Sequence, residues 1–499
     1  MIPSLYADYC CFCNNYISTE KGMSRMGKKQ DEVQDLSFKE RGKMIISFFA
    51  TINSKNGLIE GSEKKYNLHA RYDKKLTGNP IAKERVQMKI GVGRCEMELP
   101  DGFLPAEGFV KQVHPLYVRV LFLAEEEPFA LVSIEMTSLA DEECARLRKE
   151  TAILLGIAES RVWISVTHTF SAPHILPDMA LKTEEDREHR TVLRRTLSDA
   201  VRSAVWQARQ QVQESEAVLH QGESRTFASR DIELEEGWWI GCCGKGPSDP
   251  ALTVIEIRQG DTVKGLLLHL NTQSSVLDGT GAEDGKCVSG DYVGIACMEL
   301  EKRFPGAAVL FMIGAAGDQA PVRRGKGYAP DGKGGYAETD LHEEAVAVAE
   351  KLGNQLKEEV LQTLNHEGTV LTGKAVSASR TFHAPAKKMN RNLRELKPTH
   401  GCEWELDGDR EQTIELFALG DLAIVGVRPE LTCITLRQIQ EASPYPVTLL
   451  ATLINGVSKY MADQSAYDRY MYEAINSPFA PGAAEQLVRE AAALLRKQA

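Results

Sequence analysis

The segment VTHTFSAPH, at residues 166–174, holds two imidazoles and three hydroxyl groups directly after the strand-like run 161–165. An imidazole can bind a metal or transfer a proton, and α/β proteins often carry such groups where a rigid strand passes into a loop. His168 is therefore a candidate functional residue. A histidine that only satisfies its hydrogen bonds in a strand-end loop is the alternative interpretation.

Polar residues follow two further apolar runs. In LLLHLNTQSSVLDGTG, the side chains of His269, Asn271 and Gln273 would share one face of a strand, because side chains alternate. In VLFMIGAAGDQAP, Asp318 follows small residues that would let the backbone approach a ligand closely. His269 could equally be a core histidine bonded to backbone, and Asp318 could cap a turn.

A fourth apolar run, DLAIVGVRPELT, places Glu430 at the start of an expected helix. A carboxylate there is favoured by the helix dipole even without a functional role. Taken together, a histidine, a Gln/His pair and a glutamate at strand ends suggest a metal site built from distant segments. The spacing alone cannot establish such a site, because the ligands are not neighbours in the sequence.

The elements that must position these residues alternate between strand and helix from Met88 onward, which indicates an α/β fold. A helix is expected at 185–213 and another after Pro481-Gly482, each with an apolar stripe at helical spacing. The Gly-rich stretch 324–338 is expected to be a mobile surface loop. The expected strands cover residues 116–123, 129–134, 162–166, 252–257, 263–270, 308–312, 422–427 and 447–453.

Residues 1–88 differ in composition from the rest of the chain. They are rich in Lys, Ser, Asn and Gly and show no sustained hydrophobic periodicity. We expect them to be a poorly ordered or accessory N-terminal extension, or alternatively a small separate domain, and residues 89–499 to be one catalytic domain. The extension carries 15 Lys and Arg against 10 Asp and Glu, whereas the whole chain has a net charge of −11. The body of the chain is therefore acidic, which argues against a nucleic-acid partner.

The 11 cysteines are scattered, and the pair Cys242-Cys243 lacks a second pair at zinc-ribbon spacing. We find no secretory signal and no apolar run long enough to span a membrane. A cytoplasmic location with free thiols is the simplest expectation.

The ordered series VTHTFSAP, QSSVLDG, CVSGDYVG, FMIGAAGDQAP, VGVRPELT, NGVSKY and YMYEA resembles the neutral ceramidase family over about residues 90–497. The likeness is to the shorter bacterial members in particular. It implies an α/β catalytic domain with mixed sheets and flanking helices and without a C-terminal immunoglobulin-like domain.

The resemblance also implies roles for individual residues. His168 matches a zinc-binding histidine, Glu430 matches a zinc-binding glutamate, and Tyr460 matches a tyrosine that binds the metal weakly. Tyr472 matches a tyrosine thought to hydrogen-bond the reacting carbonyl, and Arg230 matches an arginine that faces the substrate.

Three positions depart from the family pattern. Phe170 replaces a second motif histidine, Gln273 replaces a zinc-binding histidine, and Ala320 replaces a serine. Because an amide is a poor zinc ligand, either His269 takes the place of the missing imidazole, the metal is held more weakly, or it is absent. Gln273 thus stands as the fourth candidate ligand, and Zn²⁺ or another divalent ion as the expected cofactor.

These observations predict a metal-dependent hydrolase that cleaves an amide-like carbon–nitrogen bond in a small substrate other than ceramide. A bound metal would polarise the carbonyl and activate water, and Tyr472 and Arg230 would stabilise the oxyanion. The alternatives are a non-catalytic binding or regulatory descendant of the same fold, or a metal-dependent lyase or isomerase.

Overall fold

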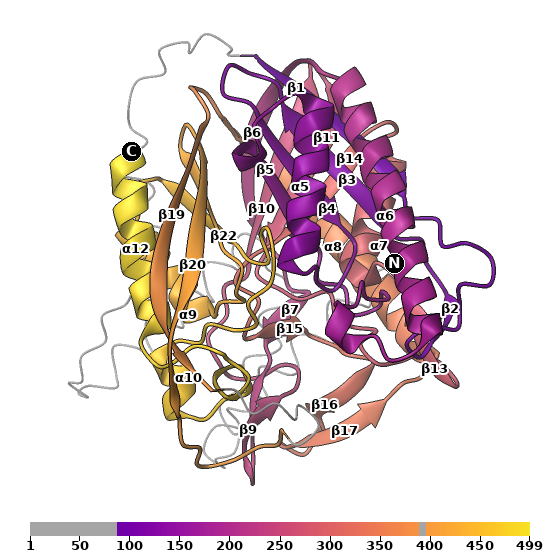
Figure 1. Cartoon of the computed structure of the whole chain (residues 1–499), viewed down its shortest axis with the longest axis vertical. Helices are drawn as coiled ribbons and strands as arrows, with labels where there is room; N and C mark the ends of the chain where they lie inside the picture. Colours follow the sequence, from indigo (N-terminus) through magenta and orange to yellow (C-terminus); the bar gives the residue numbers. More distant parts are fainter. Residues whose placement is uncertain (1–86, 389–395) are drawn as a thin grey trace, which may run out of the picture. The chain divides into compact units, whose positions relative to one another are not determined.

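The computed structural model describes residues 87–388 and 396–499 of the chain. The predicted extension 1–88 lies, except for its last two residues, outside the described residues. Within them, the chain contains both strands and helices, as the sequence predicts, but several strands often follow one another before the next helix (Figure 1).

The largest sheet has nine strands in the order β14-β11-β10-β6-β1-β3-β4-β5, with β18 paired to β6. Two predicted strands, 129–134 and 162–166, coincide with β4 and β5 residue for residue, because both are buried along their whole length and apolar except for Ser133 and Ser165. The strands of this sheet are β1 Met88–Glu96, β3 Tyr117–Leu123, β4 Phe129–Ile134, β5 Val162–Val166, β6 Gln213–Glu223, β10 Ala251–Gln259, β11 Thr262–Leu270, β14 Ala308–Ile313 and β18 Thr369–Val370.

A second sheet has four strands, β19 Val376–Lys387, β20 Leu406–Leu419, β21 Leu422–Gly426 and β22 Val447–Ala451, in chain order. Its side chains alternate between two cores. In β21, Leu422 and Ile424 pack toward the nine-stranded sheet, whereas Ala423 and Val425 pack toward helices on the other side. β19 and β20 form a long antiparallel pair that the sequence analysis did not identify (Figure 1).

The two sheets lie face to face, and helices cover both outer faces. The helices over the nine-stranded sheet are α5 Asp141–Leu155, α6 Glu184–Gln210, α7 Asp291–Arg303 and α8 Glu344–Leu364. Those over the four-stranded sheet are α9 Cys433–Ala442 and α12 Ala483–Gln498. The result is a four-layered α/β/β/α arrangement, which agrees with the predicted fold class.

Helix α6 confirms the predicted long helix and corrects its end. Thr183 and Asp186 form a capping box at its start, which satisfies exposed backbone N–H groups. The helix ends at Gln210 rather than Gln213, because Gln213 already begins strand β6. The predicted apolar stripe is buried at Leu193, Leu197, Ala200, Val201, Ala204, Val205 and Ala208.

The expectation of a loop at 324–338 is wrong. Lys326–Pro330 and Tyr336–Asp340 form the antiparallel hairpin β16–β17, and the Asp331 carboxylate closes its turn by accepting N–H bonds from Lys333 and Gly335. The other short elements are β2 Phe109–Gln112, η1 Glu159–Arg161, η2 Asp178–Ala180, β7 Phe227–Ser229, β8 Asp231–Leu234, β9 Gly237–Ile240, β12 Gly281–Ala282, β13 Gly285–Val288, β15 Gln319–Pro321, α10 Gln464–Asp468 and α11 Tyr472–Ile475.

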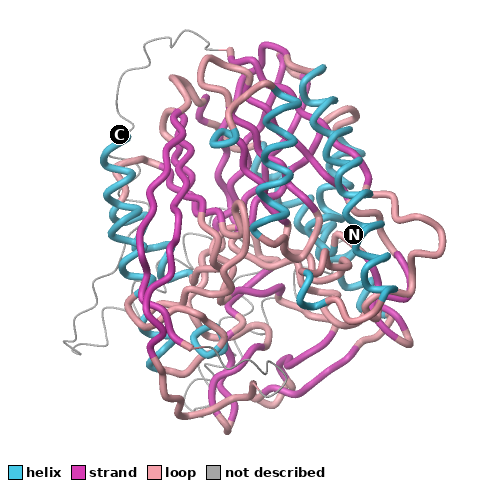
Figure 2. The backbone as a smooth tube through the Cα atoms, in the orientation of Figure 1, coloured by secondary structure: helices cyan, strands magenta, loops and turns pink. Residues whose placement is uncertain are grey.

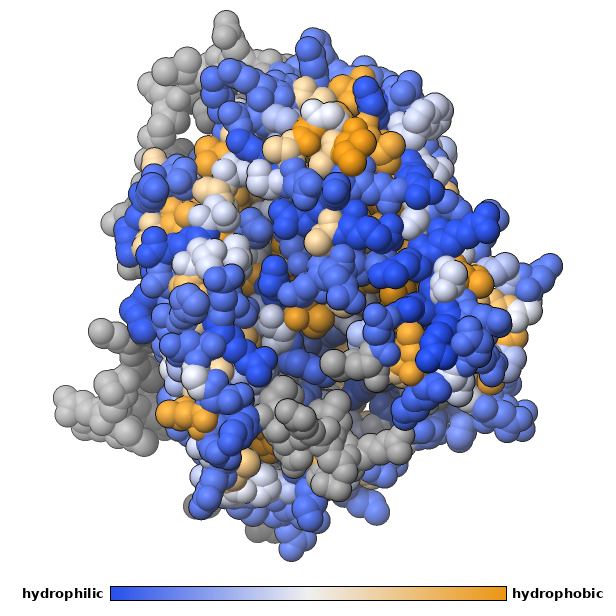
Figure 3. All heavy atoms as spheres, viewed as in Figure 1, coloured by the Kyte–Doolittle hydropathy of each residue, from blue (hydrophilic) through white to orange (hydrophobic). Residues whose placement is uncertain are grey.

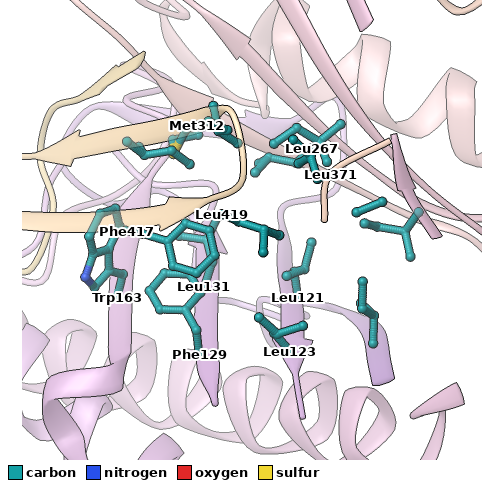
Figure 4. A pocket seen from close by; sticks show the side chains of 16 residues that line it. Leu121, Leu123, Phe129, Leu131, Trp163, Leu267, Met312, Leu371, Phe417 and Leu419 are labelled. Atoms are coloured by element: carbon teal, nitrogen blue, oxygen red, sulfur yellow. The ribbon is translucent and has the colours of Figure 1, made fainter. Parts of the chain in front are cut away.

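An apolar cavity of about 50 Å³ lies between the two sheets (Figure 4). Phe129, Trp163 and Leu422 line it, and each stands at or near the start of its strand. The cavity is therefore at the other end of these strands from the loops that follow them. No helix among the described residues is long and apolar enough to cross a membrane, and the face drawn in Figure 3 is mostly hydrophilic.

Candidate active site

The loops that follow strands of both sheets meet at one place, among the loop segments drawn in Figure 2. A parallel bridge joins Thr169, after β5, to Ser274, after β11. A second parallel bridge joins Glu430, after β21, to Tyr460, after β22. The first bridge aligns His168 with Gln273, the second aligns Glu430 with Tyr460, and the hydrogen bond from Gln273 to Glu430 joins the two pairs.

The side chains at this place form a continuous chain of polar contacts. Arg230 Nη1 donates to Gln273 Oε1 at 3.1 Å, and Gln273 Nε2 donates to Glu430 Oε2 at 2.6 Å. His168 Nε2 lies 3.4 Å from the same Glu430 oxygen. All four side chains are buried. Four of the six predicted site residues are thus joined directly.

Tyr460 and Tyr472 complete the predicted set by lying against the guanidinium of Arg230. The Arg230 Cζ is 5.3 Å from the centre of the Tyr460 ring and 5.7 Å from that of Tyr472. Tyr472 is half-buried at the start of α11, and its ring also meets Trp239 of β9 edge-on at 5.4 Å. Asn476 donates a hydrogen bond of 3.0 Å to the Tyr472 hydroxyl, which fixes its position.

Burial and opposite charges act against each other in the cluster. Burial lowers the pKa of His168, but the Glu430 carboxylate and the Thr137 carbonyl together raise it more, so that the net shift is upward. Burial raises the pKa of Glu430, but the positive charges of His168 and Arg230 bring it below its usual value. Burial, with the Glu430 charge, raises the pKa of Tyr460, which keeps its phenol protonated at neutral pH.

The arrangement around His168 fits a metal ligand. Its Nδ1 hydrogen-bonds the Thr137 carbonyl oxygen, which is how metal-binding histidines are commonly oriented. Its buried Nε2 has no hydrogen-bond partner within the described part of the chain, and it points to the Glu430 carboxylate. His168 and Glu430 could therefore hold a divalent ion between them.

The remaining donors are weaker. In residues 87–388 and 396–499, no group of three or more His, Cys, Asp or Glu side chains is placed to hold a metal. A third ligand would have to come from Gln273, whose oxygen already accepts a bond from Arg230, or from the protonated Tyr460. The residues thus fit an ion held by two strong donors, one fewer than catalytic zinc sites usually have.

His269 does not take part in this cluster. Its Nε2 lies 2.8 Å from the Leu450 carbonyl oxygen, and burial lowers its pKa. The predicted shared face holds for His269 and Asn271, whose side chains both lie beside Gly314, but not for Gln273, which follows the end of β11 at Leu270 and contacts Glu430. Gln273, and not His269, occupies the position beside Glu430.

Asp318 has the capping role that was one of its two interpretations. Its carboxylate accepts the backbone N–H of Cys433 at 3.0 Å, at the first residue of α9. The small residues before it approach protein rather than a ligand, since a Cβ at Gly317 would lie 2.9 Å from the Leu431 carbonyl oxygen. Glu430 lies outside α9, so the helix-dipole interpretation of that residue does not hold.

Glu473 is a further buried residue of the site, and the sequence did not predict it. Its side chain is buried, and neither carboxylate oxygen has a hydrogen-bond partner among the residues the structure describes. Burial, together with the Asp318 charge and against the opposing effect of Arg230, raises its pKa to about 7. The only sequence signal was its place beside Tyr472, which does not distinguish it from an ordinary helix residue.

Comparison with known proteins supports the fold. No family model and no curated protein matches the sequence. Two solved structures match the fold with a TM-score of 0.63 and 14% identity over 83% of this chain. One is a ceramidase complexed with C2, of which 76% is covered, and the other is neutral ceramidase from Pseudomonas aeruginosa, of which 75% is covered. The chain therefore has a neutral-ceramidase-like fold.

Proposed function

We propose that the chain is a hydrolase that cleaves an amide-like carbon–nitrogen bond in a small molecule. The observation that carries this proposal is the buried guanidinium of Arg230 beside the His168–Glu430 pair. Its Nε and Nη2 have no hydrogen-bond partner within the described ranges, although a buried donor normally has one. Donors kept free in a buried site suit an oxygen that gains negative charge during a reaction.

In this proposal Arg230 and Tyr472 stabilise the oxyanion that forms when the carbonyl carbon is attacked. Burial lowers the pKa of Arg230, but Tyr460, Glu473 and Glu430 raise it more, so it stays a cation throughout. Tyr472 is the more exposed of the two and would donate its hydroxyl proton from the side of the site nearer solvent. Trp239, packed on Tyr472, would hold that ring in place.

We further propose that His168 and Glu430 hold a divalent ion, Zn²⁺ or another, with Gln273 and Tyr460 as additional weak donors. Such an ion would polarise the carbonyl and lower the pKa of a bound water to about 7. To act as a donor to the ion, Gln273 would have to rotate its side-chain amide so that Oε1 faces the ion. It would then lose the hydrogen bond that Oε1 accepts from Arg230.

Metal content tests the proposal most directly. Protein purified without chelator is expected to hold about one divalent ion per chain, and Glu430→Ala is expected to lose it. His220 and Glu256 provide a matched control, because they form a similar pair 3.3 Å apart in β6 and β10. Glu256→Ala should leave the metal content unchanged. A wild-type protein free of metal after reconstitution would count against the metal-dependent reaction.

The substrate is tested separately with a set of soluble amides and with long-chain ceramide in detergent micelles. We expect turnover of a soluble amide and negligible turnover of ceramide, because Phe170, Gln273 and Ala320 replace groups that the resembling family uses. Efficient ceramide cleavage would contradict this part of the proposal.

A second candidate function is binding without catalysis. The hydrogen bonds from Arg230 to Gln273 and from Gln273 to Glu430 connect these three side chains without a metal between them. A protein that binds a small carboxylate or amide at Arg230 without turnover and without metal would support this candidate over the hydrolase.

A further inference from the structure

Two adjacent cysteines, Cys242 and Cys243, follow strand β9 in a turn beside Arg230. Cys242 is buried and Cys243 is exposed, and both are free thiols. The two thiols shift each other's pKa in opposite directions. A buried thiol directly beside an exposed one in the sequence is an arrangement that core packing does not need.

The backbone of this turn is fixed from both sides. Gly241 N–H donates to the Arg230 carbonyl oxygen at 2.8 Å, and Gly244 N–H donates to the Ser229 carbonyl oxygen at 2.7 Å. Between them Cys243 has a φ of 56°, which is uncommon for a residue with a side chain. A costly conformation of this kind persists only where surrounding contacts impose it.

The environment makes Cys243 the more reactive thiol. The neighbouring Cys242 thiol lowers the pKa of Cys243 to about 7, while Cys243 and burial raise the pKa of Cys242. The Val322 carbonyl oxygen lies 3.1 Å from the Cys243 sulfur and favours the protonated form, so thiol and thiolate coexist near neutral pH. Exposed thiolates of this kind are the cysteines that peroxides oxidise.

We propose that Cys243 and Cys242 are a redox-active pair that reduces hydroperoxides. The Cys243 thiolate attacks the terminal peroxide oxygen, the O–O bond breaks, and the departing oxygen takes a proton to leave as water or an alcohol. The Cys243 sulfenic acid is then attacked by the Cys242 sulfur, which loses its proton, and the sulfenic oxygen leaves as water. Two electrons pass from the two sulfurs to the peroxide, and a disulfide joins the neighbouring residues.

The geometry predicts that this disulfide is easily reduced. Neighbouring Cα atoms are about 3.8 Å apart across a trans peptide, whereas disulfides usually join Cα atoms roughly 4.4–6.8 Å apart. A strained disulfide has a more oxidising potential than a structural one and is reduced more readily by thiols. The pair would therefore cycle between dithiol and disulfide and would not act as a structural disulfide that stabilises the fold.

Peptide mapping of the full chain tests the proposal, because the tryptic peptide Asp231–Lys245 contains both cysteines and no other. After brief treatment with hydrogen peroxide and alkylation of free thiols, the wild-type peptide is expected to have lost two hydrogens and to carry no alkyl group. Dithiothreitol should restore double alkylation. A peptide that stays doubly alkylated while other cysteines oxidise would overturn the proposal, as would linkage of Cys243 to a different cysteine.

Two variants assign the roles of the thiols. Cys242→Ser removes the resolving thiol, so Cys243 should accumulate as a sulfenic acid that dimedone captures. Cys243→Ser should leave Cys242 reduced, because that thiol is buried. Cys402→Ser is the control, since this half-buried cysteine lies in another segment, and it should leave the disulfide yield unchanged. Equal oxidation of Cys242 in the Cys243→Ser variant would contradict the assignment.

Discussion

Arg230 Nη1 donates to Gln273 Oε1 at 3.1 Å, and this bond occupies the one oxygen of Gln273 that could bind a metal. The amide nitrogen on the other side donates to Glu430. Gln273 therefore connects a cation to a carboxylate where the resembling family has an imidazole. In the proposed metal site, the identity of this residue would decide how firmly a divalent ion is held, which leads to the first prediction.

Gln273→His should strengthen metal binding. An imidazole at this position would add a third strong donor beside His168 and Glu430, and would give up the bond to Arg230. We expect the affinity for Zn²⁺ to rise at least about tenfold, which corresponds to about 1.4 kcal/mol. Competition with a chromogenic chelator measures the affinity. Gln412→His, at another buried glutamine, is the control and should have no effect.

Arg230→Lys should reduce turnover far more than it changes substrate binding. Lysine keeps the positive charge but loses the planar fork, so the donors at Nε and Nη2 disappear together. The loss of an oxyanion donor predicts a fall in kcat of about 10²–10³. Steady-state kinetics on the best soluble amide measures it. A change confined to KM would instead indicate that Arg230 only binds the ground state.

Glu473→Gln should remove part of the pH dependence of stability. Because the pKa of Glu473 is raised to about 7 in the folded chain, the folded state keeps a proton that the unfolded state loses above about pH 4.5. The contribution of the protonated Glu473 side chain to the free energy of unfolding is therefore fully present below pH 4.5 and is lost as the pH rises through 7. A glutamine side chain at this position cannot ionise, so the variant should gain on the order of 1–3 kcal/mol relative to wild type between pH 4.5 and 8.

Urea unfolding at several pH values measures this difference. Glu367→Gln, at an exposed position, is the control and should follow the wild-type curve at every pH. Parallel curves for wild type and Glu473→Gln would show that Glu473 is ionised in the folded protein at acidic pH, contrary to the prediction.

The buried parts of the fold could be predicted from the sequence, and the exposed strands could not. β4 and β5 are apolar except for one buried serine each, because both faces are covered, so their bounds are visible as largely apolar runs. β20 begins with six exposed residues, of which four are charged, and such a sequence is typical of a loop. Its strand form depends on pairing with β19, a partner that the local sequence does not reveal.

The candidate site likewise contains residues that could be predicted from the sequence and residues that could not. His168 and Glu430 could be proposed because each follows a buried strand. The choice between His269 and Gln273 depended on where β11 ends, and propensity does not fix a strand end to one residue. Glu473 could not be singled out, because its unusual environment arises from Arg230 and Asp318, which lie far away in the sequence.

Hydrolysis should proceed without a covalent acyl-enzyme. Ala320 gives the Asp318 loop no hydroxyl, and Ser171 is buried with its hydroxyl unpaired among the described residues, so it lacks the adjacent base that a serine nucleophile needs. His168 cannot serve as that base while its Nε2 faces Glu430. Water is then the attacking group. Rapid quenching during turnover should give the unmodified protein mass and no initial burst of amine. An acyl adduct on any Ser, Thr or Cys would refute a direct attack by water, and Ser171→Ala, expected to retain activity, would identify whether that residue carries it.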